Sequence, residues 1–169
     1  MNRKLPESFF QRDVLEVSPQ LLGKYLVRKF DNGEICRYRI TDVEAYRGEE
    51  DKASHSSKGR TARTEVQYGE GGKIYTYLIY GMYWLLNIVT DRKDNPQGVM
   101  IRAVDNIYGP GRVGKELQLD LSFRGESIAG DRLWIEDDGK EYPYITAPRV
   151  GIDYAKEWKD VHWRFILKE

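Results

Sequence analysis

An uncharged, tyrosine-rich run at residues 74–89 restricts what this chain can fold into. It spans about 16 residues, fewer than the roughly 20 apolar residues that a membrane-spanning helix needs. Its alternating pattern is typical of strands, and Tyr80 and Gly81 near its middle favour a turn. We therefore predict a β-hairpin over residues 73–90 and reject a membrane span. So much flat, hydroxylated surface suits stacking on planar ligands.

The register of this hairpin depends on the length of its turn. A two-residue loop would place Tyr77 on the same face as Trp84 and Leu86. A three-residue loop, formed by residues 80–82, would bring a different set of side chains onto one face: Tyr75, Tyr77, Leu85 and Asn87. The sequence alone does not choose between these two registers.

A polar strand and an unusual arginine flank the hairpin in the sequence. In the run ITDVEAY, strand alternation places Asp42, Glu44 and Tyr46 on one face, so that Glu44 lies beside an aromatic ring. Taken alone, a strand carboxylate of this kind is more often simply solvated. Arg102 is the charged residue of an otherwise apolar strand, where it either pairs with a carboxylate or takes part in function.

The first third of the chain favours a helix followed by another hairpin. Ser18 can cap a helix, Pro19 suits its first turn and Gly23 suits its end. Residues 24–30 and 34–46 have strand character, and the Asp-Asn-Gly sequence between them is a tight-turn signal. We therefore expect these two strands to pair with each other. Residues 47–72 form a long polar loop of the kind that is often functional.

The remaining elements decide the predicted fold class. Near the end of the chain, Trp163, Phe165 and Leu167 alternate in a strand and are expected to face the core. Antiparallel hairpins with a few helices predict an α+β fold with a curved, partly barrel-like antiparallel sheet, flanking helices and a protruding β-hairpin. The length of 169 residues suits a single domain spanning residues 1–169.

Cysteine and histidine usage limits the chemistry available to the chain. The single cysteine, Cys36, excludes an internal disulfide and a cysteine-based zinc site. With His55 and His162 as the two histidines, we expect no protein-held metal and no cofactor. The basic N-terminal residues are not followed by an apolar run, so we expect no secretory signal and a cytoplasmic location.

The charge is balanced overall but unevenly distributed. A net charge of zero weighs against a nucleic-acid partner, because such domains are often basic. Residues 52–64 nevertheless carry four basic residues and no acidic one, whereas residues 131–141 carry five acidic residues against two basic ones. Charge runs of this kind most often form an ordinary solvated surface.

The segment GPGRVG at residues 109–114 matches the GxGxxG pattern of dinucleotide-binding loops, follows a strand and opens a helix. The match is misleading, because the chain lacks repeated strand-helix-strand units and Pro110 restricts the turn. We reject nicotinamide binding. A helix N-terminus with Arg112 and Lys115 nearby could still hold a phosphate group.

Several linked motifs together resemble one enzyme family. They are VEAYRGEEDKASHSSKGRT, YTYLIYGMYWLLNIVT, MIRAV, GPGR and PRVGI followed by EW and RF. In this order and spacing they resemble the alkyladenine (3-methylpurine) DNA glycosylase family over residues 15–167. The resemblance implies a monomeric enzyme of base excision repair, associated with the nucleoid when bound to DNA. Such enzymes flip alkylated or deaminated purines, such as 3-methyladenine, hypoxanthine and ethenoadenine, out of duplex DNA and hydrolyse the N-glycosidic bond.

The resemblance also implies roles for the residues that hold the reacting water and the base. Glu44 corresponds to the general base that activates water, Arg102 to an arginine that helps hold it, and the backbone carbonyl of Val150 to a third contact. The residues matching those that sandwich the flipped base are Tyr46, His55 and Tyr77. Asn87 corresponds to a residue that clashes with the 2-amino group of guanine, which requires the three-residue hairpin loop.

The DNA contacts follow from the same resemblance. Tyr80 corresponds to a residue that wedges into the minor groove, and the phosphate contacts would come from Arg60, Arg63, Arg112 and Lys115. Nothing in the sequence indicates a lysine that acts as a Schiff-base nucleophile. We therefore expect a monofunctional hydrolase that leaves an abasic site. Two other classes remain open: a non-catalytic module that binds nucleic acid, RNA included, and a small-molecule nucleosidase.

Overall fold

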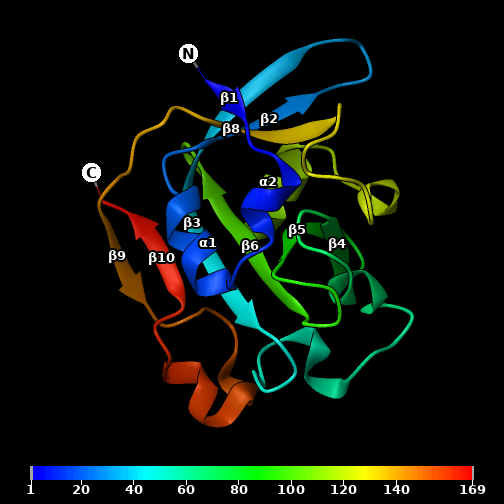
Figure 1. Ribbon diagram of the computed structural model, residues 1–169, viewed down its shortest axis with the longest axis vertical. Helices are drawn as coiled ribbons and strands as arrows, with labels where there is room; N and C mark the ends of the chain where they lie inside the picture. The colour runs from blue at the N-terminus through cyan, green and yellow to red at the C-terminus, as the bar shows by residue number, and fades with distance from the viewer. Residues whose placement is uncertain (1, 169) are drawn as a thin grey trace.

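The computed structural model describes residues 2–168 and is built around a large antiparallel sheet (Figure 1). In chain order the strands are β1 (Arg3–Lys4), β2 (Tyr25–Lys29), β3 (Ile35–Arg47), β4 (Ile74–Ile79), β5 (Tyr83–Thr90), β6 (Gln97–Val104), β7 (Ile107–Tyr108), β8 (Leu133–Asp137), β9 (Tyr144–Ala147) and β10 (Arg164–Leu167). The α-helices are α1 (Val14–Leu21) and α2 (Pro110–Glu116), and the 3₁₀ helices are η1 (Glu7–Phe10), η2 (His55–Lys58), η3 (Glu65–Tyr68), η4 (Leu121–Phe123) and η5 (Asp153–Asp160).

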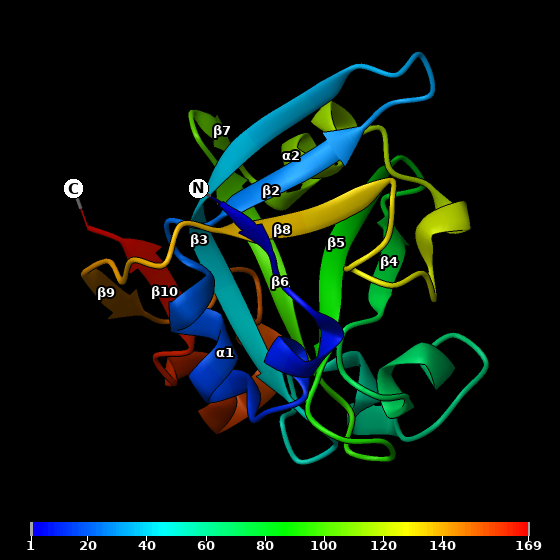
Figure 2. The same cartoon turned by 45° about the horizontal axis from the view of Figure 1, so that its top comes forward.

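The sheet is twisted but open. Its hydrogen-bonded order is β1-β8-β2-β3-β6-β5-β4, while β10 pairs with both β3 and β9, and β7 pairs with β6. Figure 2 shows β2 and β8 running across the direction of β4 and β5, as expected of a strongly twisted sheet. The predicted α+β class is confirmed. Within the described chain, the two ends of this order, β1 and β4, do not pair, so the barrel-like curvature stops short of closure.

Strand β3 connects the two halves of the sheet, and its pairing with β6 contains two irregularities. Ile40 pairs with Val104, Asp42 with Ala103 and Val43 with Ile101. This register leaves Thr41 of β3 and Arg102 of β6 without a directly opposite residue. Bulges of this kind bend a strand and change the direction in which a side chain points. Arg102 therefore lies at a local break in the ladder, close to where β3 carries Glu44.

The first helix begins earlier than the sequence predicted. Asp13, not Ser18, caps α1, because its side chain accepts a hydrogen bond from the backbone N–H of Leu15 at 2.9 Å. Ser18 is buried within the helix, and Pro19 lies near its C-terminal end instead of in its first turn. Gly23 does follow the helix, with φ +84°, a conformation that glycine adopts readily.

The hairpin of β4 and β5 has a three-residue loop. Ile79 pairs with Tyr83, Tyr77 with Leu85 and Tyr75 with Asn87, which settles the register question. Tyr80 and Gly81 both have positive φ, at 51° and 66°, and the N–H of Met82 donates to the carbonyl of Ile79 at 3.1 Å. Consistent with two strands in this run, no helix among the described residues is long and apolar enough to cross a membrane.

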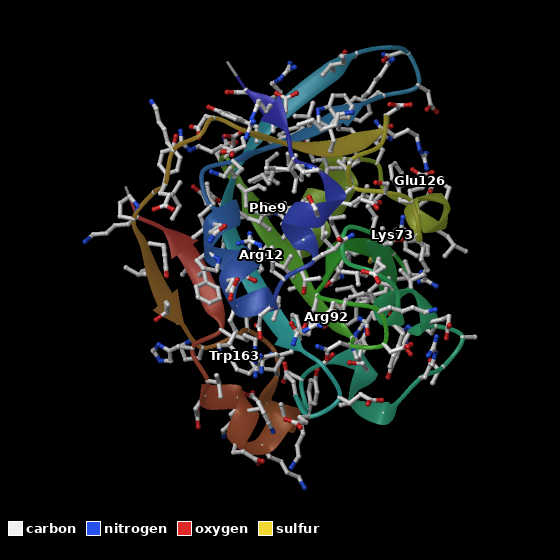
Figure 3. All side chains as sticks on the ribbon, viewed as in Figure 1. Phe9, Arg12, Lys73, Arg92, Glu126 and Trp163 are labelled. Atoms are coloured by element: carbon white, nitrogen blue, oxygen red, sulfur yellow. The ribbon has the colours of Figure 1, made fainter. Side chains whose placement is uncertain are left out.

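The core lies on the face of the sheet that α1 covers. Val43 and Ala45 of β3 are fully buried there, and Phe165 of β10 joins them as predicted, with Trp163 and Leu167 packed partly against the same core. Figure 3 labels Trp163, which lies where β10 begins, close to η5. Helix α2 contributes Val113 to the same core and packs directly against β5, so that a Cβ at Gly114 would lie 1.8 Å from the carbonyl oxygen of Trp84.

Candidate active site

A row of paired side chains crosses four strands on the face opposite the core. Glu44 of β3 pairs with Met100 of β6, Met100 with Asn87 of β5, and Asn87 with Tyr75 of β4. Directly paired residues in antiparallel strands project to the same side of a sheet. The row therefore brings together a carboxylate, an amide and an aromatic ring that are far apart in the sequence.

Loops and helix ends close this row into a cavity of roughly 410 Å³. The segments with η2, η3 and η5 lie at the same end of the molecule, away from the β2–β3 turn (Figures 1 and 2). The predicted site residues that line the cavity are Tyr46, His55, Tyr77, Tyr80, Asn87, Arg102 and Val150. A volume of this order accommodates a small organic ligand or a single base.

Glu44 lies immediately behind the cavity wall and has no exposed area. Its carboxylate accepts hydrogen bonds from the Tyr46 hydroxyl at 2.8 Å and from the backbone N–H of Val150 at 2.7 Å. The Arg102 Nη1 atom lies 3.8 Å from Glu44 Oε2. Burial raises the pKa of Glu44, and the Val150 N–H, the Arg102 charge and the Tyr46 hydroxyl oppose this rise by favouring the carboxylate.

Val150 contacts Glu44 through its backbone N–H, whereas the resemblance had directed attention to its carbonyl. The neighbouring Arg149 holds this segment in place and carried no sequence signal of its own. Its side chain forms a fully buried ion pair with Asp51, including an Nη2–Oδ1 hydrogen bond of 2.9 Å, and donates to the carbonyl of Ala45 at 2.9 Å. Residues 149–150 are thereby fastened to both β3 and the loop that follows it.

The aromatic side chains form two groups around the cavity. The rings of His55 and Tyr77 are in edge-to-face contact, with centroids 4.0 Å apart, and His55 Nδ1 lies 3.2 Å from the Tyr75 hydroxyl. Tyr46 also lines the cavity, and the Arg149 guanidinium lies 5.0 Å from its ring centroid. Burial, assisted by the positive charge of Arg63, lowers the pKa of His55 to about 4, so its imidazole is neutral at physiological pH.

Tyr80 at the hairpin tip lines the cavity, whereas the four basic side chains expected to contact phosphates are not among its lining residues. Tyr80 is 87% exposed, so it packs into no core of its own. Arg112 and Lys115 are exposed on α2, whose first residue lines the cavity, and Arg63 lies 5.8 Å from the Tyr77 ring centroid. Arg60 is already paired with two carboxylates, those of Glu65 and Asp94, so a phosphate would have to compete for it.

Gln67 and Tyr154 are among the cavity-lining residues that the sequence patterns did not single out. Gln67 comes from η3 and is nearly buried, and Tyr154 comes from η5 and is mostly exposed. Both belong to irregular segments, where no periodicity indicates which way a side chain points. Within residues 2–168 we find no group of three or more His, Cys, Asp and Glu side chains that could hold a metal ion.

The chain is similar to known proteins over nearly its whole length. The family model described as Methylpurine-DNA glycosylase (MPG) matches residues 8–108 and 105–169. A Legionella pneumophila (strain Lens) protein named "Putative 3-methyladenine DNA glycosylase" is 41% identical over 176 residues, covering 99% of this chain and 96% of its own length. Proteins of the same name from Desulfitobacterium hafniense (strain Y51) and Methanocella arvoryzae are each 39% identical, covering 99% and 97% of this chain and 96% and 92% of their own lengths.

Proposed function

The chain belongs to the methylpurine-DNA glycosylase family of DNA-repair enzymes, which hydrolyse N-glycosyl bonds, and we propose that it acts as a monomer that excises alkylated and deaminated purines from duplex DNA. The observation that carries this proposal is the set of contacts around Glu44. A buried carboxylate, fixed by the Tyr46 hydroxyl and the Val150 N–H, lies beside Arg102 at the wall of an aromatic cavity.

In the proposed reaction Glu44 acts as general base toward water. The bond between C1′ and the base nitrogen breaks with its electron pair leaving on the base, and the sugar passes through an oxocarbenium-like state. The water oxygen then bonds to C1′, and its proton passes to the Glu44 carboxylate. The products are an abasic site and the free base, which is neutral at once when the substrate was a cationic alkylated purine, whereas a neutral purine leaves as an anion and must take up the proton that the water gave to Glu44. A carboxylate near C1′ also stabilises the positive charge that develops there.

Arg102 and Glu44 are spaced for a bridging water. Their 3.8 Å separation is longer than a hydrogen bond, which is the spacing at which a water molecule can join two polar groups. Glu44 already accepts from Tyr46 and Val150, but each carboxylate oxygen has a second lone pair. A water held by Glu44 and Arg102 would therefore be oriented for attack. Because Glu44 itself is covered, C1′ must approach it past the lining side chains.

The aromatic walls favour an electron-poor purine. His55 and Tyr77 are too close to each other to admit a base between them, so the base would stack between this pair and the ring of Tyr46, which also lines the cavity. An alkylated purine carries positive charge, and its attraction to aromatic faces is worth about 1 kcal/mol or more when desolvated. The neutral state of His55 avoids a repulsion that an imidazolium would impose on such a base. No separate hydrogen bond is then needed for each lesion.

Extrusion of the nucleotide follows from the position of the cavity. A base inside a duplex cannot reach a carboxylate behind the wall of a cavity, so the nucleotide must leave the stack. Tyr80, exposed at the hairpin tip, would fill the space that the nucleotide vacates. Asn87, which lies in the row with Glu44, would clash with the 2-amino group of guanine and so protect normal guanine.

The test uses duplex oligonucleotides that contain hypoxanthine, ethenoadenine or methylated adenine. After incubation and treatment with alkali, strand cleavage at the lesion reports an abasic site. We expect cleavage with the wild type, and a loss of at least about 100-fold with Glu44→Gln, which should still bind the lesion duplex. Unchanged single-turnover excision by Glu44→Gln would contradict the role of Glu44.

Other outcomes of the same assay identify the alternatives. Binding of lesion duplexes by the wild type without base release would indicate a non-catalytic nucleic-acid module. Release from free nucleosides but not from duplex DNA would indicate a nucleosidase. A covalent enzyme–DNA adduct trapped by borohydride would show a Schiff-base intermediate and contradict the monofunctional mechanism.

A further inference from the structure

Two side-chain amides of the cavity carry buried atoms that lack hydrogen-bond partners. Gln67 is 9% exposed and Asn87 is 7% exposed, and both line the cavity. Among residues 2–168, neither Gln67 Oε1 nor Asn87 Nδ2 has a hydrogen-bond partner. Buried polar atoms in native proteins are nearly always paired, and leaving one unpaired costs free energy. Both atoms belong to side chains that line the same cavity, which is what a site for a polar ligand would leave behind.

Several of the other polar side chains in this cavity are already engaged. The Tyr46 hydroxyl donates to Glu44, His55 Nδ1 contacts the Tyr75 hydroxyl, and Ser54 Oγ lies 2.8 Å from Ser56 Oγ. Stacking surfaces on the cavity walls are sequence-tolerant and do not distinguish one purine edge from another. Hydrogen bonds that read a base edge must therefore come from the groups that remain, and Gln67 is one of them.

We propose that Gln67 is a specificity-determining residue, whose side-chain amide hydrogen-bonds the polar edge of the extruded purine. This inference rests on the proposed glycosylase function and extends it to a residue of η3. A primary amide both donates and accepts, so it can meet either an exocyclic amino group or an exocyclic oxygen. Gln67 can thus hydrogen-bond both 6-amino and 6-oxo purines. Stacking interactions do not distinguish these two kinds of purine.

The contribution of Gln67 should depend on the charge of the base. A cationic methylpurine gains binding energy from the aromatic walls and leaves easily, because bond cleavage neutralises it. A neutral base such as hypoxanthine has neither advantage and depends more on hydrogen bonds to its edge. Loss of the Gln67 amide should therefore impair excision of neutral lesions more than excision of cationic ones.

The experiment compares the wild type with Gln67→Met, which keeps the side-chain length and removes both hydrogen-bonding groups. Single-turnover release of hypoxanthine from a duplex should fall by about 10-fold or more. Release of methylpurines from alkylated DNA should fall by less than about 3-fold. The fluorescence change of an ethenoadenine duplex, which reports extrusion, should weaken in parallel. The melting temperature of the free protein should not fall, because the unpaired Oε1 contributes no hydrogen bond to the fold.

Thr90→Val is the matched control. Thr90 lies on β5 like Asn87, and its buried hydroxyl also lacks a partner among the described residues, but it does not line the cavity. This variant should leave the ratio of hypoxanthine to methylpurine release unchanged.

Three results would overturn the inference. They are an unchanged ratio in Gln67→Met, an equal loss for both lesions, or a fall in melting temperature that shows a structural role for the amide. A wild type that releases no base from any lesion would instead refute the proposed function itself, and the inference with it.

Discussion

Glu44 combines two opposing requirements in one side chain. As the proposed general base it must be ionised, yet its burial disfavours the carboxylate and raises its pKa. The hydroxyl of Tyr46, two residues along the same strand, offsets part of this effect by donating to Glu44 Oε1. Tyr46 would thus have two functions, since its ring also forms one wall of the cavity.

The first prediction concerns the pH dependence of excision in Tyr46→Phe. A general base works in its ionised form, so activity rises as the pH rises through the pKa of Glu44. Removing the Tyr46 hydroxyl removes a donor that favours the carboxylate, and the pKa of Glu44 rises further. The rising limb of the single-turnover rate against pH should therefore move to higher pH.

The Tyr77→Phe variant is the matched control for this measurement. It also removes a hydroxyl from the cavity while keeping the ring, but that hydroxyl contacts the sulfur of Met100, not Glu44. Its rising limb should remain where it is in the wild type. If Tyr46→Phe likewise leaves the limb in place, the Tyr46 hydroxyl does not tune Glu44.

At the scale of secondary-structure elements, the tip of the β4–β5 hairpin departs from the usual turn chemistry. Tyr80 and Gly81 both have positive φ, which a tight hairpin turn requires at these positions. Asparagine and glycine adopt this conformation easily, whereas a bulky aromatic residue is strained there. A strained, 87% exposed tyrosine is better explained by a binding role than by stability.

The Tyr80→Asn variant should separate stability from DNA binding. Asparagine suits the left-handed conformation, so thermal stability should stay the same or rise by about 1 kcal/mol. Affinity for a lesion duplex should fall, as should the extruded fraction read by base-analogue fluorescence, because the wedge is gone. The control is Tyr108→Ala, which removes another exposed tyrosine outside the cavity. Equal affinity in Tyr80→Asn and the wild type would rule out the wedge.

A second element-level feature is the attachment of the segment at residues 149–150 to β3. Arg149 forms a fully buried ion pair with Asp51 and donates to the carbonyl of Ala45. Lysine cannot reproduce a planar, two-pronged contact of this kind. Removal of one partner from a buried pair typically costs about 3–5 kcal/mol of stability. Arg149→Lys retains the charge and is therefore more informative than a substitution that removes it.

We expect Arg149→Lys to lower the melting temperature and to slow excision. If the Val150 N–H is displaced from Glu44, the pKa of Glu44 rises and the rising limb of the pH profile also moves to higher pH. The corresponding substitution Arg132→Lys, in a two-pronged pair with Glu126 away from the cavity, should change stability without moving the limb. A stability loss in Arg149→Lys with an unmoved limb would mean that the buried pair has no role in positioning.

At the scale of the whole molecule, the balanced charge limits non-specific binding to DNA. The net charge is zero, so attraction to phosphates depends on local basic groups and not on an overall field. Arg112 and Lys115 are exposed on α2, while Arg60 is paired with Glu65 and Asp94. Such a protein should need a lesion and a few phosphate contacts to bind firmly.

The salt dependence of affinity tests this view. Each phosphate contact contributes about −0.9 to the slope of log affinity against log salt concentration, so Arg112→Ala should reduce the slope by about 1. Arg60→Ala should reduce it by less, because two carboxylates already compete for that guanidinium. Arg37→Ala, near the β2–β3 turn, should leave the slope unchanged when binding to a lesion duplex is followed by fluorescence anisotropy. An unaltered slope in Arg112→Ala would exclude this phosphate contact.

Several features of the fold could be read from the sequence because their causes are local. Strand alternation and turn residues located β2, β3, β4, β5 and β10, and these hairpin patterns indicated the α+β class. The linked motifs were sufficient to identify the family. The start of α1 was wrong, because Asp13 and Ser18 are both good capping residues and the choice depends on where the helix packs.

The sequence by itself therefore determined the five strands named above, the family and the first candidate residues, since all of these depend on neighbours along the chain. Only the tertiary structure decided the three-residue hairpin register, the bulge at Arg102 and the N–H of Val150 that donates to Glu44. It also showed the Arg149–Asp51 pair and the unpaired amide of Gln67. Each of these is fixed by cross-strand pairing or by packing between distant segments, and no local pattern encodes such contacts.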